Sequence, residues 1–190
     1  FGEPLAILAG DGLLTEAVHL MLAPDADPSR VVLATREVTR AAGPRGMVGG
    51  QVLDMALSGA PPGDLEQLKT MHGMKTGAML RAACTSGAIL AGASSVDLER
   101  AGSYGAHLGL AFQVADDILD IEGDEAKLGK PVGSDERMQK STYPGLLGLE
   151  PSRRMGQDLA DRAVEAISGY SGDRAEFLAD LARYVIQRTE

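Results

Sequence analysis

The spacing of apolar residues constrains the fold of this chain most strongly. Apolar side chains recur every three or four residues over successive stretches, which is the period of an amphipathic helix, and no stretch shows the apolar–polar alternation of a strand. Composition agrees, since alanine and leucine together number 51 of the 190 residues whereas valine, isoleucine and threonine together number 25. Because the first pair favours helices and the second group favours strands, the sequence predicts an all-α protein.

Proline and glycine clusters divide the chain into the predicted helices. Asp64 follows one such cluster, and its side chain is expected to accept a hydrogen bond from the backbone N–H of Gln67 at a helix start. A chain of this length forms about one domain, so residues 1–190 are expected to belong to a single all-α unit. The helices are predicted at about residues 5–22, 29–42, 47–58, 64–92, 95–121, 135–147, 152–168 and 174–188.

Charge and composition exclude several classes of function. The net charge is -9, aromatic residues make up 4% of the chain and tryptophan is absent, so the basic surface and stacking rings of a nucleic-acid-binding protein are missing. No apolar run is expected to be long enough to span a membrane. The single cysteine, Cys84, cannot form an internal disulfide, and no Cys/His zinc pattern is present. A reducing, cytoplasmic setting is therefore expected.

Small and polar residues on two predicted helices each allow two interpretations. Glycines and alanines, including Gly73 and Gly77, make one flank of the helix over residues 64–92 small. This flank could allow a close helix–helix approach, or it could leave room for an apolar ligand. Gln51 and Asp54 share a face of the helix over residues 47–58, where a hydrogen bond between helices explains them as well as a catalytic role does.

Three carboxylates lie on one face of the helix predicted over residues 95–121. Asp116, Asp117 and Asp120, together with Gln113, fall within an arc of roughly 100°. Like charges at this spacing repel by a few tenths of a kcal/mol per pair, so the cluster is either a solvated acidic face or a site for a hard cation. Mg²⁺ suits such a site, since it is usually held by one or two carboxylates plus phosphate oxygens.

Several lysines could supply the remaining charge that a bound diphosphate needs. Lys75 lies on the helix over residues 64–92, and Lys130 and Lys140 follow the acidic cluster with Asp135 between them. Taken singly, each lysine is explained as a surface residue. Taken together with the carboxylates, they favour a site in which a metal ion binds some diphosphate oxygens and ammonium groups bind the others.

These motifs resemble those of the trans-polyprenyl diphosphate synthases, in particular the short-chain bacterial farnesyl and geranylgeranyl type. The strongest match is the stretch from Phe112 to Asp120, which is similar to the second aspartate-rich motif of that family. The resemblance covers essentially the whole chain. The other matching segments are Phe1-Gly2-Glu3, Leu8-Ala9-Gly10-Asp11, Gly49-Gly50-Gln51-x-x-Asp54, Lys75-Thr76-Gly77, Gly129-Lys130, Asp135, Lys140-Ser141-Thr142-Tyr143-Pro144 and Tyr184-Val185-Ile186-Gln187-Arg188.

The resemblance implies a homodimeric, isoprenoid-synthase-like bundle of helices around a central cavity. It also implies a prenyltransferase reaction, in which Mg²⁺ ionises an allylic diphosphate and the double bond of isopentenyl diphosphate attacks the carbocation before a proton is lost. The implied residue roles are metal binding by Asp116, Asp117, Asp120 and Asp135, diphosphate binding by Lys75, Lys130 and Lys140, and a catalytic position beside the reacting carbons for Lys75, Thr76 and Gln113.

One departure from the family pattern is large. The family's first aspartate-rich motif and most of its isopentenyl diphosphate site have no counterpart here. We therefore expect residues 1–190 to be the C-terminal part of a single polyprenyl synthetase domain with its N-terminal helices missing, and the 190-residue chain alone to be inactive. The alternatives are a non-catalytic, prenyl-synthase-like subunit that pairs with a complete synthase, and a class I terpene cyclase, which Lys130 and Lys140 fit less well.

Overall fold

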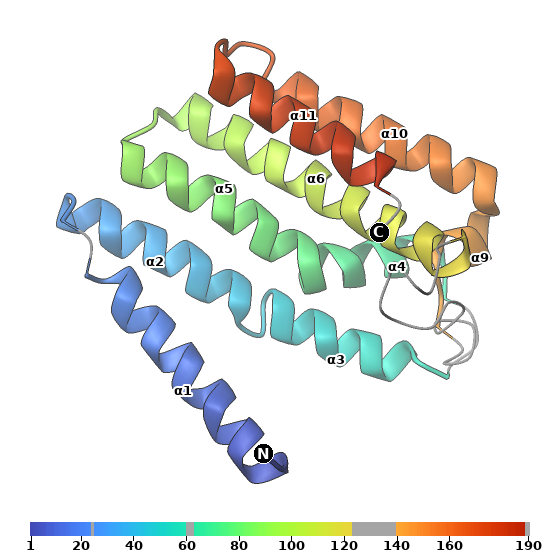
Figure 1. The fold of residues 1–190 in the computed structure, drawn as a ribbon, viewed down its shortest axis with the longest axis horizontal. Helices are drawn as coiled ribbons and strands as arrows, with labels where there is room; N and C mark the ends of the chain where they lie inside the picture. Colours follow the sequence, from blue (N-terminus) through green and yellow to red (C-terminus); the bar gives the residue numbers. More distant parts are fainter. Residues whose placement is uncertain (24, 60–62, 123–139, 189–190) are drawn as a thin grey trace.

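The computed structural model describes residues 1–23, 25–59, 63–122 and 140–188. Every regular element among these residues is helical (Figure 1), so the prediction of an all-α fold is confirmed. The elements are α1 (Glu3–Met21), α2 (Pro28–Ala42), α3 (Met47–Leu57), α4 (Leu65–His72), the π-helix η1 (Gly73–Gly77), α5 (Ala78–Ala91), α6 (Ser95–Glu122), α9 (Tyr143–Leu147), α10 (Leu149–Ala166) and α11 (Asp173–Gln187).

Helix α6 is the central element of the bundle. It packs extensively against α5 and α10 and also contacts α11, while α2 lies against the far side of α5 (Figure 1). The hydrophobic core lies mainly between α4, α6, α9, α10 and α11, and its largest fully buried apolar side chains are Tyr104, Tyr143, Leu68 and Val114. The chain thus surrounds α6, which carries the acidic cluster, with packed helices.

Glycines bring α6 into close contact with the neighbouring helices. A Cβ atom added at Gly105 would lie 2.7 Å from Cα of Arg81, and one added at Gly109 would lie 2.7 Å from Cα of Gly77. Carbon atoms in ordinary contact are about 3.5–4.0 Å apart. The small flank of the predicted helix over residues 64–92 therefore serves close helix packing at Gly77, while at Arg81 the close approach depends on Gly105 of α6.

The predicted helix over residues 64–92 differs from the observed one in an informative way. Its start is confirmed, because Asp64 Oδ1 accepts a 2.8 Å hydrogen bond from the backbone N–H of Gln67. The predicted span is helical without a break from α4 through η1 to α5, but its middle is the π-helix η1 rather than a regular α-helix. Glycines stand at both ends of η1, at positions 73 and 77, and glycine is unfavourable in the interior of a regular α-helix. Of the helix predicted over 135–147, residues 140–147 are described, and only Tyr143–Leu147 (α9) of these are helical, because Thr142 caps the start of α9.

Helix α1 extends away from the rest of the bundle and packs against α2 (Figure 1). None of its residues is buried, and its exposed apolar side chains include Leu5, Ile7, Leu8, Leu13 and Leu14. By length and composition alone, the 19-residue helix α1 is long and apolar enough to cross a membrane, with a mean hydropathy of 1.2 over its most apolar 18-residue window. The expectation that no apolar run approaches that length is therefore wrong for this helix by length and composition, because its leucine, isoleucine, valine and alanine residues outweigh Asp11 and Glu16 in mean hydropathy.

Candidate active site

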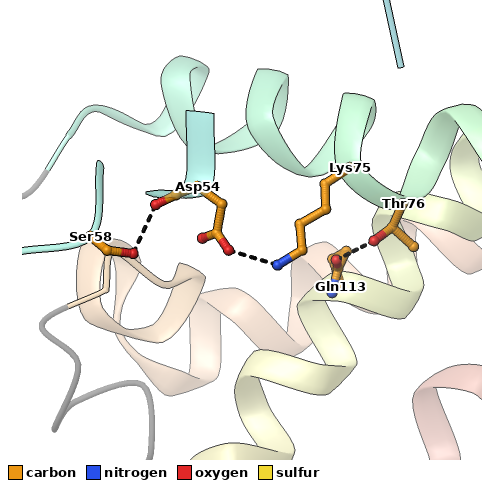
Figure 2. A network of polar contacts seen from close by, with 5 residues as sticks. All are labelled: Asp54, Ser58, Lys75, Thr76 and Gln113. Carbon is orange, nitrogen blue, oxygen red and sulfur yellow. Dashed lines mark hydrogen bonds and ion pairs between the residues drawn. The ribbon is translucent and has the colours of Figure 1, made fainter. Parts of the chain in front are cut away.

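The π-helix η1 presents two neighbouring side chains to two different helices. Lys75 Nζ donates a 2.7 Å hydrogen bond to Asp54 Oδ2 on α3, and Thr76 Oγ1 donates a 2.6 Å hydrogen bond to Gln113 Oε1 on α6 (Figure 2). Short π-helical segments within α-helices occur frequently at functional sites. Here the segment brings α3 and α6 into one polar network with Lys75 and Thr76 at its centre.

Glycine at position 50 makes the contact between α3 and Lys75 possible. A Cβ atom at Gly50 would lie 2.2 Å from the backbone nitrogen of Lys75 and 2.4 Å from its Cα. The side chains of Asp54 and Lys75 are 15% and 29% exposed, so their ion pair is largely shielded from water. Of the two residues whose role the sequence left open, Asp54 makes a contact between helices, whereas Gln51 is exposed.

The acidic cluster on α6 divides into residues with different surroundings. The side chain of Asp116 is 39% exposed, and its Oδ1 lies 3.6 Å from Nη2 of Arg188, just beyond the end of α11. The guanidinium carbon of Arg188 lies 4.2 Å from the centroid of the Phe112 ring, which is a cation–π geometry. The end of α11 is thereby held against the N-terminal part of the acidic cluster.

Asp117 and Asp120 are both buried, with exposed fractions of 5% and 2%. Asp117 Oδ2 accepts a 2.9 Å hydrogen bond from the backbone N–H of Tyr143, at the start of α9. This bond connects the acidic helix to the segment that carries Lys140. A position on one helical arc therefore does not give the three carboxylates equal access to solvent.

His72 lies among the charged residues of the site although no role was predicted for it. It ends α4 and is 7% exposed, and burial together with the charge of Lys75 lowers its pKa from 6.5 to about 4. Asp54, Asp116 and Lys140 also lie close enough to act on this pKa. Side chains from α3, η1, α6 and the segment before α9 therefore lie around His72.

The donor set of the site suits a hard cation that also binds a ligand. Among the described residues, no group of three or more His, Cys, Asp or Glu side chains is arranged to hold a metal ion. Mg²⁺ does not need such a group, because it is usually held by one or two carboxylates and completes its shell with waters and phosphate oxygens. The partly exposed carboxylate of Asp116 fits this requirement. Lys130 and Asp135, predicted for diphosphate and metal binding, lie outside the described residues.

Sequence comparison relates the chain to known enzymes. The polyprenyl synthetase family matches residues 1–172. Geranylgeranyl pyrophosphate synthase 11 of Arabidopsis thaliana is 41% identical over 193 residues, which cover 99% of this chain and 54% of that protein. Farnesyl diphosphate synthase of Geobacillus stearothermophilus is 49% identical over 152 residues, which cover 78% of this chain and 51% of that protein. The chain thus spans about half the length of the curated relatives it matches.

Structural comparison agrees with the sequence match. A geranyltransferase from Helicobacter pylori, solved in complex with magnesium and isoprenyl diphosphate, superposes with a TM-score of 0.82 at 27% identity. The match covers 98% of this chain and 61% of that one. The fold predicted from the resemblance, an isoprenoid-synthase-like helical bundle, is therefore confirmed, and the chain belongs to the polyprenyl synthetase family.

Proposed function

We propose that this chain supplies the diphosphate-binding part of a short-chain trans-prenyl diphosphate synthase. Such an enzyme condenses an allylic diphosphate with isopentenyl diphosphate. The observation that carries the proposal is the convergence, on one side of α6, of the Lys75–Thr76 segment with Gln113 and Asp116. Metal-binding carboxylates, ammonium groups and a buried polar pair are the groups that ionisation of an allylic diphosphate requires.

The charged groups would bind the diphosphate. Lys75 and Lys140, with Lys130, would bind its oxygens through charge-assisted hydrogen bonds. Lys75 Nζ is held in position by its ion pair with Asp54. A diphosphate that reaches Nζ therefore has to compete with the carboxylate of Asp54. Mg²⁺, held by Asp116 with Asp117, Asp120 and Asp135 as direct or surrounding ligands, would neutralise the diphosphate as it leaves.

The hydrogen-bonded pair of Thr76 and Gln113 would lie beside the reacting carbons. Gln113 is 8% exposed, and its Oε1 is already fixed by the Thr76 hydroxyl. Oxygen dipoles held in place before the reaction stabilise a developing positive charge without reorganising. Burial of Gln113 would also help to keep water away from a carbocation that water would otherwise trap.

We also propose that the complete protein is a homodimer. The apolar side chains of α1 are exposed along the whole helix, and large exposed apolar patches mark protein or membrane contacts. Asp11, near the middle of α1, would cost about 2.5–3.5 kcal/mol at the centre of a bilayer, which favours a protein contact. Sedimentation of the full-length protein should give a dimer, and Leu8→Glu should shift it toward monomer. A monomeric wild type would contradict this part of the proposal.

Turnover tests the proposed reaction. The full-length gene product, incubated with Mg²⁺, an allylic diphosphate and radiolabelled isopentenyl diphosphate, should form a labelled longer product. Lys75→Ala should lower turnover by about 10²–10³, the usual effect of removing one group that stabilises the transition state. Lys69→Ala is the matched control, because Lys69 pairs with Glu66 on the exposed face of α4 and should leave turnover unchanged.

The same assay tests the prediction that the 190-residue chain alone is inactive. Without the family's first aspartate-rich motif the second substrate would not be oriented, and orientation contributes several kcal/mol to such reactions. Labelled longer product formed by the 190-residue chain would contradict this prediction. Equal turnover by wild type and Lys75→Ala would overturn the assignment of the diphosphate site.

A further inference from the structure

Two buried aromatic rings are in contact beneath the charged groups of the candidate site. The rings of His72 and Tyr143 have centroids 5.4 Å apart and planes tilted by 48°. His72 is 7% exposed and Tyr143 is fully buried. The two residues come from parts of the chain 71 positions apart, so this contact joins the end of α4 to the start of α9.

The polar atoms of these rings are not explained by local hydrogen bonding. Nδ1 of His72 and the hydroxyl of Tyr143 are both buried, and neither has a hydrogen-bond partner among the described residues. Buried polar atoms are satisfied in most proteins, so an exception calls for a specific reason. The rings therefore contribute through their shape and their position rather than through polar contacts.

Each ring is linked by a short piece of backbone to one of the candidate diphosphate-binding lysines. Lys75 follows His72 by three residues on η1, and Lys140 precedes Tyr143 by three residues. Tyr143 is further fixed through its backbone N–H, which donates to Asp117 on the acidic helix. A change at the ring contact would therefore be transmitted to Lys75 across less than one turn of helix, and to Lys140 across three residues of non-helical chain.

We propose that the His72–Tyr143 ring contact sets the separation of Lys75 and Lys140, and with it the affinity of the site for a diphosphate group. This inference rests on the proposed function, because it assigns both lysines to the same ligand. His72 and Tyr143 are positioning residues in this account, since they act through the lysines and not by touching the ligand. Burial keeps the imidazole neutral, so its role does not depend on charge.

Ring-removing and ring-retaining variants of the full-length protein test this proposal. His72→Ala and Tyr143→Leu remove one ring each, while His72→Phe and Tyr143→Phe keep a ring and remove the polar atoms. The Kd for inorganic diphosphate in the presence of Mg²⁺ is measured by calorimetry. Removing a ring should raise this Kd about 2- to 10-fold, the range expected for loss of an aromatic pair. The phenylalanine variants should bind within about twofold of wild type.

Two further measurements separate positioning from a general loss of stability. Ile167→Ala removes a buried side chain at the far end of α10, so it should lower the melting temperature without changing the Kd. In turnover assays the ring-removing variants should raise KM for the allylic diphosphate more than they lower kcat. A double variant, His72→Ala with Tyr143→Leu, should show a smaller change in Kd than the product of the two single changes.

The outcomes distinguish this inference from the proposed function. If the wild-type protein shows no turnover, but the ring-removing variants bind diphosphate more weakly than the wild type, the synthase proposal is refuted and the proposed role of the ring contact is supported. If all ring variants bind diphosphate with the Kd of the wild type, or if Ile167→Ala raises this Kd as much as removing a ring does, the proposed role of the ring contact is overturned. This conclusion does not depend on the turnover. A wild type that binds no diphosphate would refute both.

Discussion

Replacing Gly50 by alanine should separate α3 from the Lys75 segment. The added methyl group would lie 2.2 Å from the backbone nitrogen of Lys75 and 2.4 Å from its Cα, whereas ordinary contacts begin at about 3.5 Å. Both clashing atoms belong to the backbone, so no side-chain rotation relieves them and α3 has to shift by roughly 1 Å. Overpacking of this kind typically costs about 1–3 kcal/mol. The same shift would stretch the 2.7 Å bond between Asp54 and Lys75.

Thermal unfolding followed by circular dichroism measures the effect of Gly50→Ala on stability. For a protein of 150–250 residues a loss of 1 kcal/mol lowers Tm by about 2–4 °C, so a decrease of roughly 2–12 °C is expected. Diphosphate affinity should fall as well, because Lys75 moves. Gly87→Ala on α5 is the matched control. No atom lies within 4 Å of a Cβ at Gly87, and alanine favours a helix by up to about 1 kcal/mol. Unchanged stability and affinity in Gly50→Ala would refute the packing argument.

Three other perturbations have outcomes that follow from single contacts. Tyr143→Phe should leave the free energy of unfolding equal or higher, because its hydroxyl has no hydrogen-bond partner in the part of the chain that the structure describes. Tyr104→Phe should lower the free energy of unfolding by about 0.5–1.5 kcal/mol, since its hydroxyl donates a 2.8 Å hydrogen bond to the carbonyl of Leu178. Urea unfolding compares the two variants. The pKa of His72 is about 4 in the folded protein and about 6.5 when unfolded, so the unfolded chain binds the extra proton and stability should fall by up to about 3 kcal/mol as the pH drops through this range. Repeating the acid titration with His72→Phe should remove that component, and identical profiles would contradict the assignment. Asp116→Ala should reduce turnover by about 10²–10³ while lowering stability by less than about 1 kcal/mol, as steady-state kinetics and melting curves of the full-length protein would show.

The local architecture could be predicted from the sequence because it depends on short-range signals. The cap at Asp64 and the breaks at proline and glycine clusters depend on residues within a few positions of each other, and the structure confirms them. The π-helix was not predictable in the same way. Glycines at positions 73 and 77 weaken the α-helix, but whether the backbone widens there depends on packing against α3 and α6.

The candidate site shows the same division between local and long-range information. Helical periodicity placed Asp116, Asp117 and Asp120 on one arc, but it could not indicate that Asp117 and Asp120 are buried, because burial depends on α9 to α11. His72 gave no sequence signal, since its ring partner Tyr143 lies 71 positions away. The only indication in the sequence that Arg188 belongs to the site is the resemblance of the C-terminal segment to the family. Its contacts with Phe112 and Asp116 arise from the packing of α11 beside α6.

A crystal structure of the full-length protein with Mg²⁺ and an unreactive allylic thiodiphosphate tests the central claim most directly. The account predicts that diphosphate oxygens contact Nζ of Lys75 and Lys140, that a metal ion is bound by the carboxylate of Asp116, and that the first carbon of the allylic chain lies beside Thr76 and Gln113. A diphosphate bound on another face of the bundle, or one that leaves the ion pair between Asp54 and Lys75 intact with no metal ion at Asp116, would contradict it.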